Sequence, residues 1–204
     1  IKAVSDAGQG ANYWSIGATK SVTINGKVGA TTISSLKVDA FIIGFNHNSS
    51  KEGSNRIHFL LGKISGKFVG LVDSSYGSTT STSGAFTMNT SNTNSGGWGS
   101  SQMRSKVLGS ASSPTSPTAN TLLAALPSDL RAVMKSCTKY TDNKGGSNTA
   151  SNVSSTTDYL FLLSEYEVFA THQYCNDAEP NYQAQYDYFK AVSYTHLTLP
   201  TTSR

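Results

Sequence analysis

The side chains best suited to acid–base or metal chemistry are few and far apart in the sequence. His47 and His58 flank a polar loop, while His172 and Cys175 lie close together further along the chain. Imidazole and thiolate groups bind zinc, so these side chains are the natural candidates for a metal site. Their spacing matches no standard ligand motif. We therefore predict ordinary loop and strand histidines, with no bound metal and no cofactor.

The glutamates Glu165 and Glu167 are the candidates for a pair of catalytic carboxylates. Ser164 precedes them, and a Ser followed three residues later by Glu is the capping box of a helix N-terminus. Glu165 would lie in the first turn of that helix and complement its dipole. Because capping accounts for both glutamates, we predict structural roles for Ser164 and Glu167 and no catalytic residue.

Other common catalytic motifs are missing from the sequence. Ser and Gly are abundant, but no Gly-x-Ser-x-Gly elbow, phosphate-binding loop or dinucleotide fingerprint occurs. Cys137 and Cys175 permit either one disulfide or free thiols, and their spacing does not decide between these.

Aromatic side chains among Asn, Gln, Ser and Gly are the strongest candidates for a binding surface. Rigid rings stack on ligands, while amides and hydroxyls supply adaptable hydrogen bonds. The alternative is that the same rings are core residues. On the binding interpretation, the ligand contacts are Trp98, Tyr174, Tyr182 and Tyr186.

The elements that must position these residues are clearest between residues 120 and 169. Apolar residues three and four apart predict two short helices, Thr121–Ala125 and Pro127–Lys135, that meet at the proline. The apolar run Asp158–Leu163 predicts a short strand buried on both faces. This strand leads directly into the capped helix that begins at Ser164.

Strand and turn signals dominate the first part of the chain. The Asn-Gly pair at 25–26 predicts a type I′ hairpin turn, with Lys27–Ile33 as the return strand. Val38–Phe45 predicts a buried strand, and Arg56–Ile64 with Lys67–Asp73 predicts a second hairpin. The Ser-, Thr-, Asn- and Gly-rich residues 74–97 predict a long surface loop.

Composition narrows the class of protein. Only 14% of the residues are charged and 37% are apolar, so solubility depends on hydroxyls and amides, as in β-rich extracellular, cell-surface or virion proteins. The formal charge of +4 comes from scattered lysines without a basic stripe, and we predict no binding to nucleic acid. No apolar run is long enough for a transmembrane helix, so we also predict no membrane insertion.

Several segments of the chain, taken in their order along the sequence, resemble segments of known families. LFLLSEYEVF resembles a segment of formylglycine-generating-enzyme-like domains, which have a C-type-lectin-like fold. Roughly residues 10–191 resemble the domain of unknown function 6273 family of gut bacteria and their phages. The matching segments are YWSIGATKSVTINGKVG, FIIGFNHNSSKEGSNRIHFLLGK, MNTSNTNSGGWGSSQMR, LLAALPSDLRAVMK, DYLFLLSEYEVF and NYQAQYDYFKA.

The resemblance implies a fold more than a reaction. The second family has no agreed activity, and a fold alone does not define function. Formylglycine-generating enzymes use a pair of cysteines near their C-terminus, and Cys137 and Cys175 do not fall at that place. Their activity is therefore not implied for this chain.

Together these observations predict an α+β, β-dominated fold. A hairpin-rich part, residues 1–95, is expected to precede a C-terminally truncated C-type-lectin-like part with short helices, residues 96–191. Residues 192–204, VSYTHLTLPTTSR, resemble the translation of a sequencing adapter that recurs on unrelated metagenomic reading frames. We expect this tail to be non-native.

The functional prediction is a non-enzymatic recognition or structural module of a cell surface or phage tail. Its aromatic and polar loops would contact a carbohydrate or a cell-surface protein. The alternative is a hydrolase acting on glycans or cell wall through Glu165 or Glu167. An enzyme needs a group whose pKa is tuned near neutral pH, and a scaffold does not.

Overall fold

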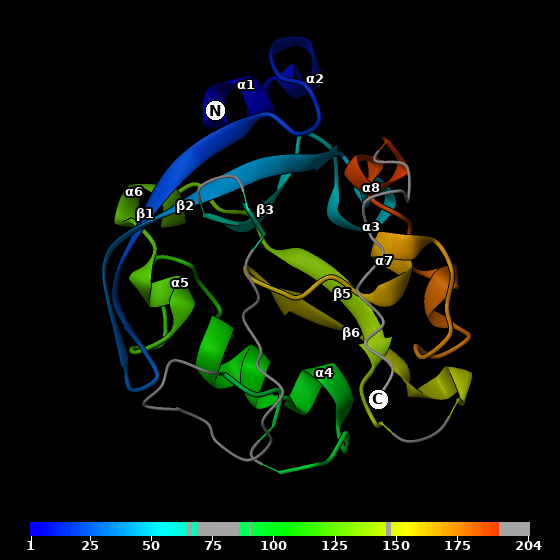
Figure 1. Cartoon of the computed structure of the whole chain (residues 1–204). Helices are drawn as coiled ribbons and strands as arrows, with labels where there is room; N and C mark the ends of the chain where they lie inside the picture. Colours follow the sequence, from blue (N-terminus) through cyan, green and yellow to red (C-terminus); the bar gives the residue numbers. More distant parts are fainter. Residues whose placement is uncertain (65–66, 69–85, 90, 146–147, 192–204) are drawn as a thin grey trace.

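Two antiparallel sheets form the framework of the computed structural model, which describes residues 1–64, 67–68, 86–89, 91–145 and 148–191 (Figure 1). The larger sheet has the order β1-β2-β3-β4, with bounds Thr19–Val28, Thr31–Phe45, Ile57–Ile64 and Lys67–Phe68. The smaller sheet pairs β5, Cys137–Asp142, with β6, Val153–Asp158. The predicted β-dominated α+β class is confirmed.

Short helices connect and cover the strands. They are α1 Lys2–Asp6, α2 Gly10–Tyr13, α3 Ser49–Glu52, α4 Gly97–Ser100, the π-helical turn η1 Met103–Leu108, α5 Leu122–Ala125, α6 Ser128–Arg131, η2 Ala150–Asn152, α7 Glu165–Phe169, η3 Glu179–Asn181 and α8 Asp187–Ala191. Among the described residues, no helix has both the length and the apolar character needed to cross a bilayer.

The first hairpin turns later than the sequence indicates. Strand β1 runs through the Asn-Gly pair to Val28, and the turn lies at residues 29–30, where Gly29 has a φ of 58°. Gly26 instead lies at a β-bulge, with a φ of 140° that favours glycine. The predicted turn at 25–26 and the return strand Lys27–Ile33 are therefore wrong. The return strand is the whole of β2, which includes the predicted strand Val38–Phe45.

Burial explains why β1 continues past its turn signal. Ile24 and Val28 are exposed to only 4% and 1%, and both contribute to the same core. A turn at 25–26 would remove Val28 from that core, and burying a valine stabilises a fold by about 1.5–3 kcal/mol. The tertiary contact thus overrides the local turn preference.

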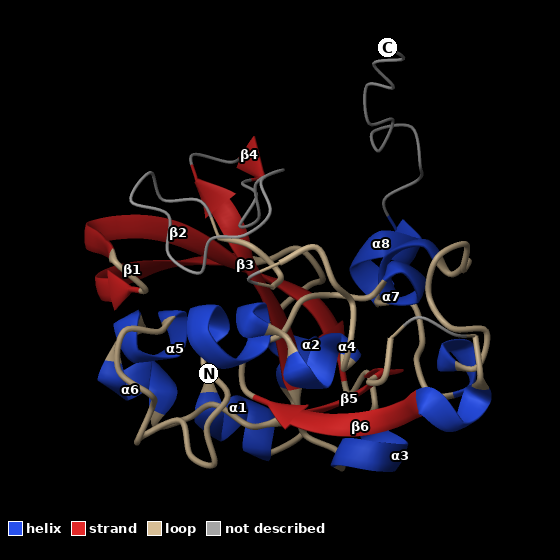
Figure 2. Cartoon of the chain, turned by 90° about the horizontal axis from the view of Figure 1, so that it is seen from below, coloured by secondary structure: helices blue, strands red, loops and turns tan. Residues whose placement is uncertain are grey.

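The first hydrophobic core joins the hairpin to the middle of the chain. The buried residues of β1 and β2 pack against η1 and α5, and Figure 2 shows α5 and α6 beside one another below the hairpin in that view. The core members are Ile24, Val28, Val38, Phe86, Met103, Val107, Leu108, Leu123, Ala125 and Leu126. Residues on both sides of position 95 therefore share one core.

The two helices predicted around Pro127 are present but short. Thr121 caps α5, because its hydroxyl oxygen accepts a hydrogen bond from the backbone N–H of Ala124 at 3.3 Å. Pro127 is the N-cap of α6, which ends at Arg131 and not at Lys135. Prolines suit the first positions of a helix because their missing N–H would be unpaired there anyway.

The strand predicted at Asp158–Leu163 lies earlier in the sequence, at Val153–Asp158. The polar run Val153–Asp158 forms β6, because its backbone pairs residue by residue with β5. The apolar run expected to be a strand, Asp158–Leu163, has only its first residue in the ladder, so that prediction is wrong. Residues 159–163 are half-buried; Tyr159, Leu160 and Leu162 pack on the first core, and Leu163 packs on a second core around Phe41.

A second core fixes the C-terminal segment to the larger sheet. Phe41, Ile43 and Tyr186 are each exposed to 1% or less. Gly44 lies beside them, and a Cβ at this position would be only 3.1 Å from the Tyr186 ring. The absence of a side chain at Gly44 therefore lets the ring approach β2 closely.

The predicted second hairpin is present as β3 and β4. Residues 65–66 and 69–85 lie outside the described residues, and the rest of the predicted strand Lys67–Asp73 and half of the predicted loop 74–97 fall there. The tail 192–204 lies outside them as well.

Candidate functional site

An apolar cavity of about 250 Å³ lies between the larger sheet and the segments that follow it in sequence. Strands β1, β2 and β3 contribute one wall, residues 126–134 contribute a second, and residues 159–161 contribute a third. The apolar wall residues are Val22, Ala40, Ile57, Phe59, Leu61, Leu126, Leu130, Val133, Met134, Tyr159, Leu160 and Phe161. Such a hollow is the usual form of a small-molecule site.

Charged residues mark the mouth of the cavity. Lys2, Asp6, Lys20 and Lys135 line it and are exposed to solvent. Lys135 donates from Nζ to Asp6 Oδ1 at 2.8 Å and to the backbone oxygen of Asn55 at 3.0 Å. Hydrogen bonds from Lys135 and Lys2 lower the pKa of Asp6 to about 2. The contact between Lys135 and Asp6 attaches α1 to the segment that follows α6.

A polar cluster includes two residues of the cavity lining, His58 and Cys137. Glu52 of α3, His58 of β3 and Cys137 of β5 bring one oxygen, one nitrogen and one sulfur atom within 4.8 Å of one another. Glu52 Oε1 accepts the backbone N–H of Thr138 at 2.6 Å, whereas Oε2 has no hydrogen-bond partner among the described residues. His58 Nε2 is 3.6 Å from Oε2, which is too long for a hydrogen bond.

Burial disfavours the charged forms of all three side chains. Removal from water lowers the pKa of His58 to about 4, with a further contribution from His47. It raises the pKa of the Cys137 thiol to about 12, and it raises the pKa of Glu52. A neutral imidazole beside a protonated thiol is a poor arrangement for nucleophilic catalysis, which requires a thiolate.

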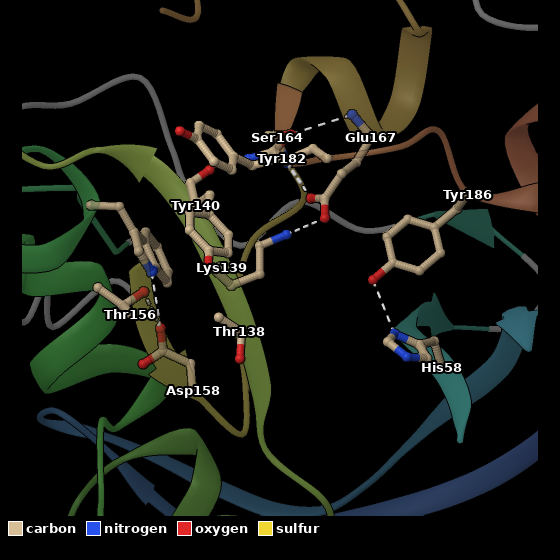
Figure 3. A network of polar contacts seen from close by, with 12 residues as sticks. His58, Thr138, Lys139, Tyr140, Thr156, Asp158, Ser164, Glu167, Tyr182 and Tyr186 are labelled. Atoms are coloured by element: carbon tan, nitrogen blue, oxygen red, sulfur yellow. Dashed lines mark hydrogen bonds and ion pairs between the residues drawn. The ribbon is translucent and has the colours of Figure 1, made fainter. Parts of the chain in front are cut away.

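Tyr186 contacts this cluster from the C-terminal segment. Its hydroxyl lies 3.0 Å from His58 Nδ1, and Figure 3 shows the two side chains pointing toward one another. The His47 ring stacks on the Tyr186 ring, and the two ring centroids are 3.5 Å apart. Tyr186 is 1% exposed, so it is a core residue and not the predicted surface contact.

Ser164 and Glu167 form the capping box expected from the sequence. The Ser164 hydroxyl accepts the Glu167 N–H at 3.2 Å, and Glu167 Oε2 accepts the Ser164 N–H at 2.9 Å. The other carboxylate oxygen, Oε1, pairs with Lys139 Nζ of β5 (Figure 3). Both oxygens of Glu167 are therefore used within the fold, which disfavours the catalytic interpretation.

Glu165 has a role that the sequence did not reveal. Its carboxylate accepts the backbone N–H groups of Gln173 and Tyr174, each at 2.9 Å, and of Cys175 at 3.1 Å. Partial burial raises the pKa of Glu165, but the N–H groups of Tyr174, Cys175 and Gln173 outweigh this and hold it below its usual value. The side chain thus anchors the loop after α7.

The other predicted ligand contacts, Tyr174, Tyr182 and Trp98, have different neighbours. Tyr174 is 86% exposed and lies at a shallow hollow of about 490 Å³ that Glu165, Phe169, Thr171 and Gln173 also line. Tyr182 stacks on Tyr140 at a centroid distance of 4.8 Å.

Trp98 is half-buried and lies in a different network. It donates from its indole nitrogen to Asp158 Oδ2 at 3.1 Å. Trp98 therefore serves a structural contact within the fold.

The structure does not bring the candidate zinc ligands together. The rings of His47 and His58 are 5.8 Å apart, but His172 faces Asp177 at 3.2 Å in an exposed loop. Cys137 and Cys175 are both free thiols. Sequence reasoning missed the Glu52–His58–Cys137 cluster because the spacing of Glu52 and His58 matches no ligand motif and Cys137 comes from β5, far along the chain.

Comparisons with protein-family models, curated proteins and solved structures found no match to this chain. The fold and the site define it as a β-dominated α+β protein with a mainly apolar cavity whose lining includes His58 and Cys137. Function has to be argued from that cavity, and the C-type-lectin-like resemblance stays a prediction.

Proposed function

We propose that the protein is a non-enzymatic ligand-binding module that takes a compact apolar molecule into this cavity. The observation that carries the proposal is the apolar wall of a 250 Å³ hollow bounded by strands. Apolar cavities of similar or smaller size bind compact hydrocarbons such as benzene. The sheet would provide rigid walls, and the charged mouth would keep the opening solvated.

The wall chemistry favours an apolar ligand over a carbohydrate. Sugar hydroxyls need hydrogen-bond partners, and burying a hydroxyl without one costs about 1–3 kcal/mol in proteins. The guanidinium of Arg56, which lines the cavity, already donates to the backbone oxygens of Glu52 and Ser136, at 2.7 and 2.6 Å. A ligand would therefore gain its affinity from burial of apolar surface.

The ionisable groups also favour binding over hydrolysis. His58 and Cys137 line the cavity, and without a bound metal ion their pKa values of about 4 and about 12 are far from the range that acid–base catalysis at neutral pH requires. Glu167 is committed to Lys139 and Ser164. The low charge and high hydroxyl content support a setting on a cell surface or phage tail, where the ligand would be the apolar part of a surface molecule.

An NMR titration with indole tests the proposal. Indole should shift the amide signals of the wall residues with a saturable dependence on its concentration. The variant Val133→Trp should abolish these shifts, because the residue lines the cavity and is 38% exposed, so a larger ring can fill the opening.

Leu36→Trp is the matched control for this experiment. Leu36 is 36% exposed and does not line the cavity, so its variant should bind indole like the parent protein. Shifts that are absent in the parent protein, or that persist unchanged in Val133→Trp, would show that the cavity is not a binding site.

A further inference from the structure

We propose that Glu52, His58 and Cys137 form a binding site for a divalent metal ion of the zinc class. This inference does not depend on the cavity binding a ligand. It rests on the juxtaposition of a carboxylate oxygen, an imidazole nitrogen and a thiol sulfur, all within 4.8 Å of one another. The side chains of Glu52 and His58 are 1% and 4% exposed, so the donors are almost completely removed from bulk water.

The distances are close to those of a metal centre. Zinc–ligand bonds of 2.0–2.3 Å at tetrahedral angles place the donor atoms about 3.3–3.6 Å from one another. Glu52 Oε2 and His58 Nε2 are already 3.6 Å apart. The Cys137 sulfur lies within 4.8 Å of the other two donors, so it has to move by at most about 1.5 Å, which a side-chain rotation can supply.

The unpaired oxygen of Glu52 is an independent indication of a ligand. Buried carboxylate oxygens are nearly always hydrogen-bonded, because leaving a buried acceptor unsatisfied costs about 1–3 kcal/mol. Oε2 has no hydrogen-bond partner among the described residues and is directed at the atoms with which it would share the metal. A bound cation would satisfy it.

The surrounding hydrogen bonds orient the donors as metal sites require. The Tyr186 hydroxyl lies 3.0 Å from His58 Nδ1, which leaves Nε2 for the metal. The Thr138 N–H binds Glu52 Oε1 at 2.6 Å and so leaves Oε2 for the metal. Each of these two ligands thus has one atom fixed by the protein and the other directed into the cluster.

The donor set indicates the class of metal. Mixed sulfur, nitrogen and oxygen ligands suit zinc, whereas magnesium and calcium prefer oxygen alone. Binding would replace the thiol proton of Cys137 and leave the carboxylate of Glu52 ionised, so the ion and its ligands would be neutral in sum. Three protein ligands leave one tetrahedral position, which a water molecule or an occupant of the cavity would take.

A cobalt titration of the full chain tests the site. Co²⁺ replaces zinc and reports its ligands, because a bound thiolate gives an intense ultraviolet charge-transfer band and tetrahedral geometry gives strong visible bands. We expect both bands to saturate at one equivalent of Co²⁺, and zinc to displace the cobalt. A saturated protein without the thiolate band would overturn the proposal.

Paired variants locate the ligands. Cys137→Ser should remove the charge-transfer band and weaken Co²⁺ binding at least tenfold, whereas Cys175→Ser should leave the spectrum unchanged. His58→Gln should weaken binding in the same way, with His172→Gln as its control. Loss of the band in Cys175→Ser, with the band kept in Cys137→Ser, would contradict the assignment.

A measurement on the parent protein covers the case in which Cys137→Ser does not fold. One equivalent of zinc should slow the reaction of Cys137 with a thiol reagent and leave that of Cys175 unchanged, as read from mass spectra of the labelled peptides. Equal protection of both cysteines, or of neither, would refute the site. Indole binding in the absence of metal separates this result from the proposal for the cavity.

Discussion

Lys139 of β5 and Glu167 of α7 form an ion pair that is almost completely hidden from water. Their side chains are 3% and 1% exposed, and the Lys139 ammonium also lies 4.4 Å from the centre of the Phe161 ring. Because Glu167 closes the capping box at Ser164 as well, one side chain fixes both the start of α7 and its attachment to the smaller sheet. The pair therefore connects a local helix signal to the tertiary structure.

Lys139→Met should destabilise the protein by about 3–5 kcal/mol. The substitution keeps the length of the side chain but leaves a buried carboxylate without its cation, and breaking a buried pair in this way costs that amount. Urea unfolding at neutral pH, followed by circular dichroism, measures the change.

Lys190→Met is the control for this prediction. Lys190 pairs with Asp187 in the same way, but their side chains are 54% and 48% exposed, so its loss should change stability by less than about 1 kcal/mol. Equal effects of the two variants would mean that burial of the Lys139–Glu167 pair has no energetic consequence.

The local signals in the sequence were informative where neighbouring residues alone decide the structure. The capping box at Ser164 and the break at Pro127 depend on contacts within one turn, and both are present. The turn at 25–26 failed because Val28 gains more from the core than the chain gains from an Asn-Gly turn.

Strand β6 shows a different reason for failure. The run Val153–Asp158 is polar and carries no strand pattern, and it becomes a strand only because β5 pairs with it. The candidate metal cluster is harder still to predict, since Glu52, His58 and Cys137 meet through the packing of α3, β3 and β5. No residue spacing in the sequence encodes that meeting.

Asp158→Asn should destabilise the protein by about 1–3 kcal/mol, because it weakens or removes hydrogen bonds that the carboxylate accepts. Asp158 is 1% exposed and accepts from Trp98 Nε1 at 3.1 Å, Arg104 Nε at 2.7 Å and Thr156 Oγ1 at 2.8 Å. An amide has one acceptor oxygen and no charge, so it cannot replace all three contacts.

The sequence has two tryptophans, so Trp98 is the only one left in a Trp14→Phe variant. The fluorescence of that variant therefore reports the surroundings of Trp98. The Asp158→Asn change should shift its emission in the folded state. An unchanged emission together with unchanged stability would show that the carboxylate does not hold the indole.

Gly97→Ala should cost more stability than Gly53→Ala. Both glycines have a positive φ, of 52° and 79°, and such a conformation costs an alanine about 1–3 kcal/mol. A Cβ at Gly97 would also overlap the backbone carbonyl of Asp142, whereas a Cβ at Gly53 meets nothing within 4 Å. Thermal unfolding of the two variants side by side measures the difference, and equal losses would contradict the close contact between α4 and β5.

Glu165→Gln should reduce stability at neutral pH, and the loss should be smaller at pH 3. Partial burial raises the pKa of Glu165, but hydrogen bonds from the backbone N–H groups of Tyr174, Cys175 and Gln173 stabilise the carboxylate more strongly. The pKa of Glu165 is therefore lower in the folded protein than in the unfolded chain. The resulting stabilisation is therefore fully present above the unfolded pKa of about 4.3 and is lost as the pH falls through the folded value. Urea unfolding of parent and variant at pH 7 and pH 3 tests this, with Gln173→Ala as a control that keeps the backbone N–H. A difference between parent and Glu165→Gln that is the same at both pH values would show that the loop amides do not stabilise the charged form.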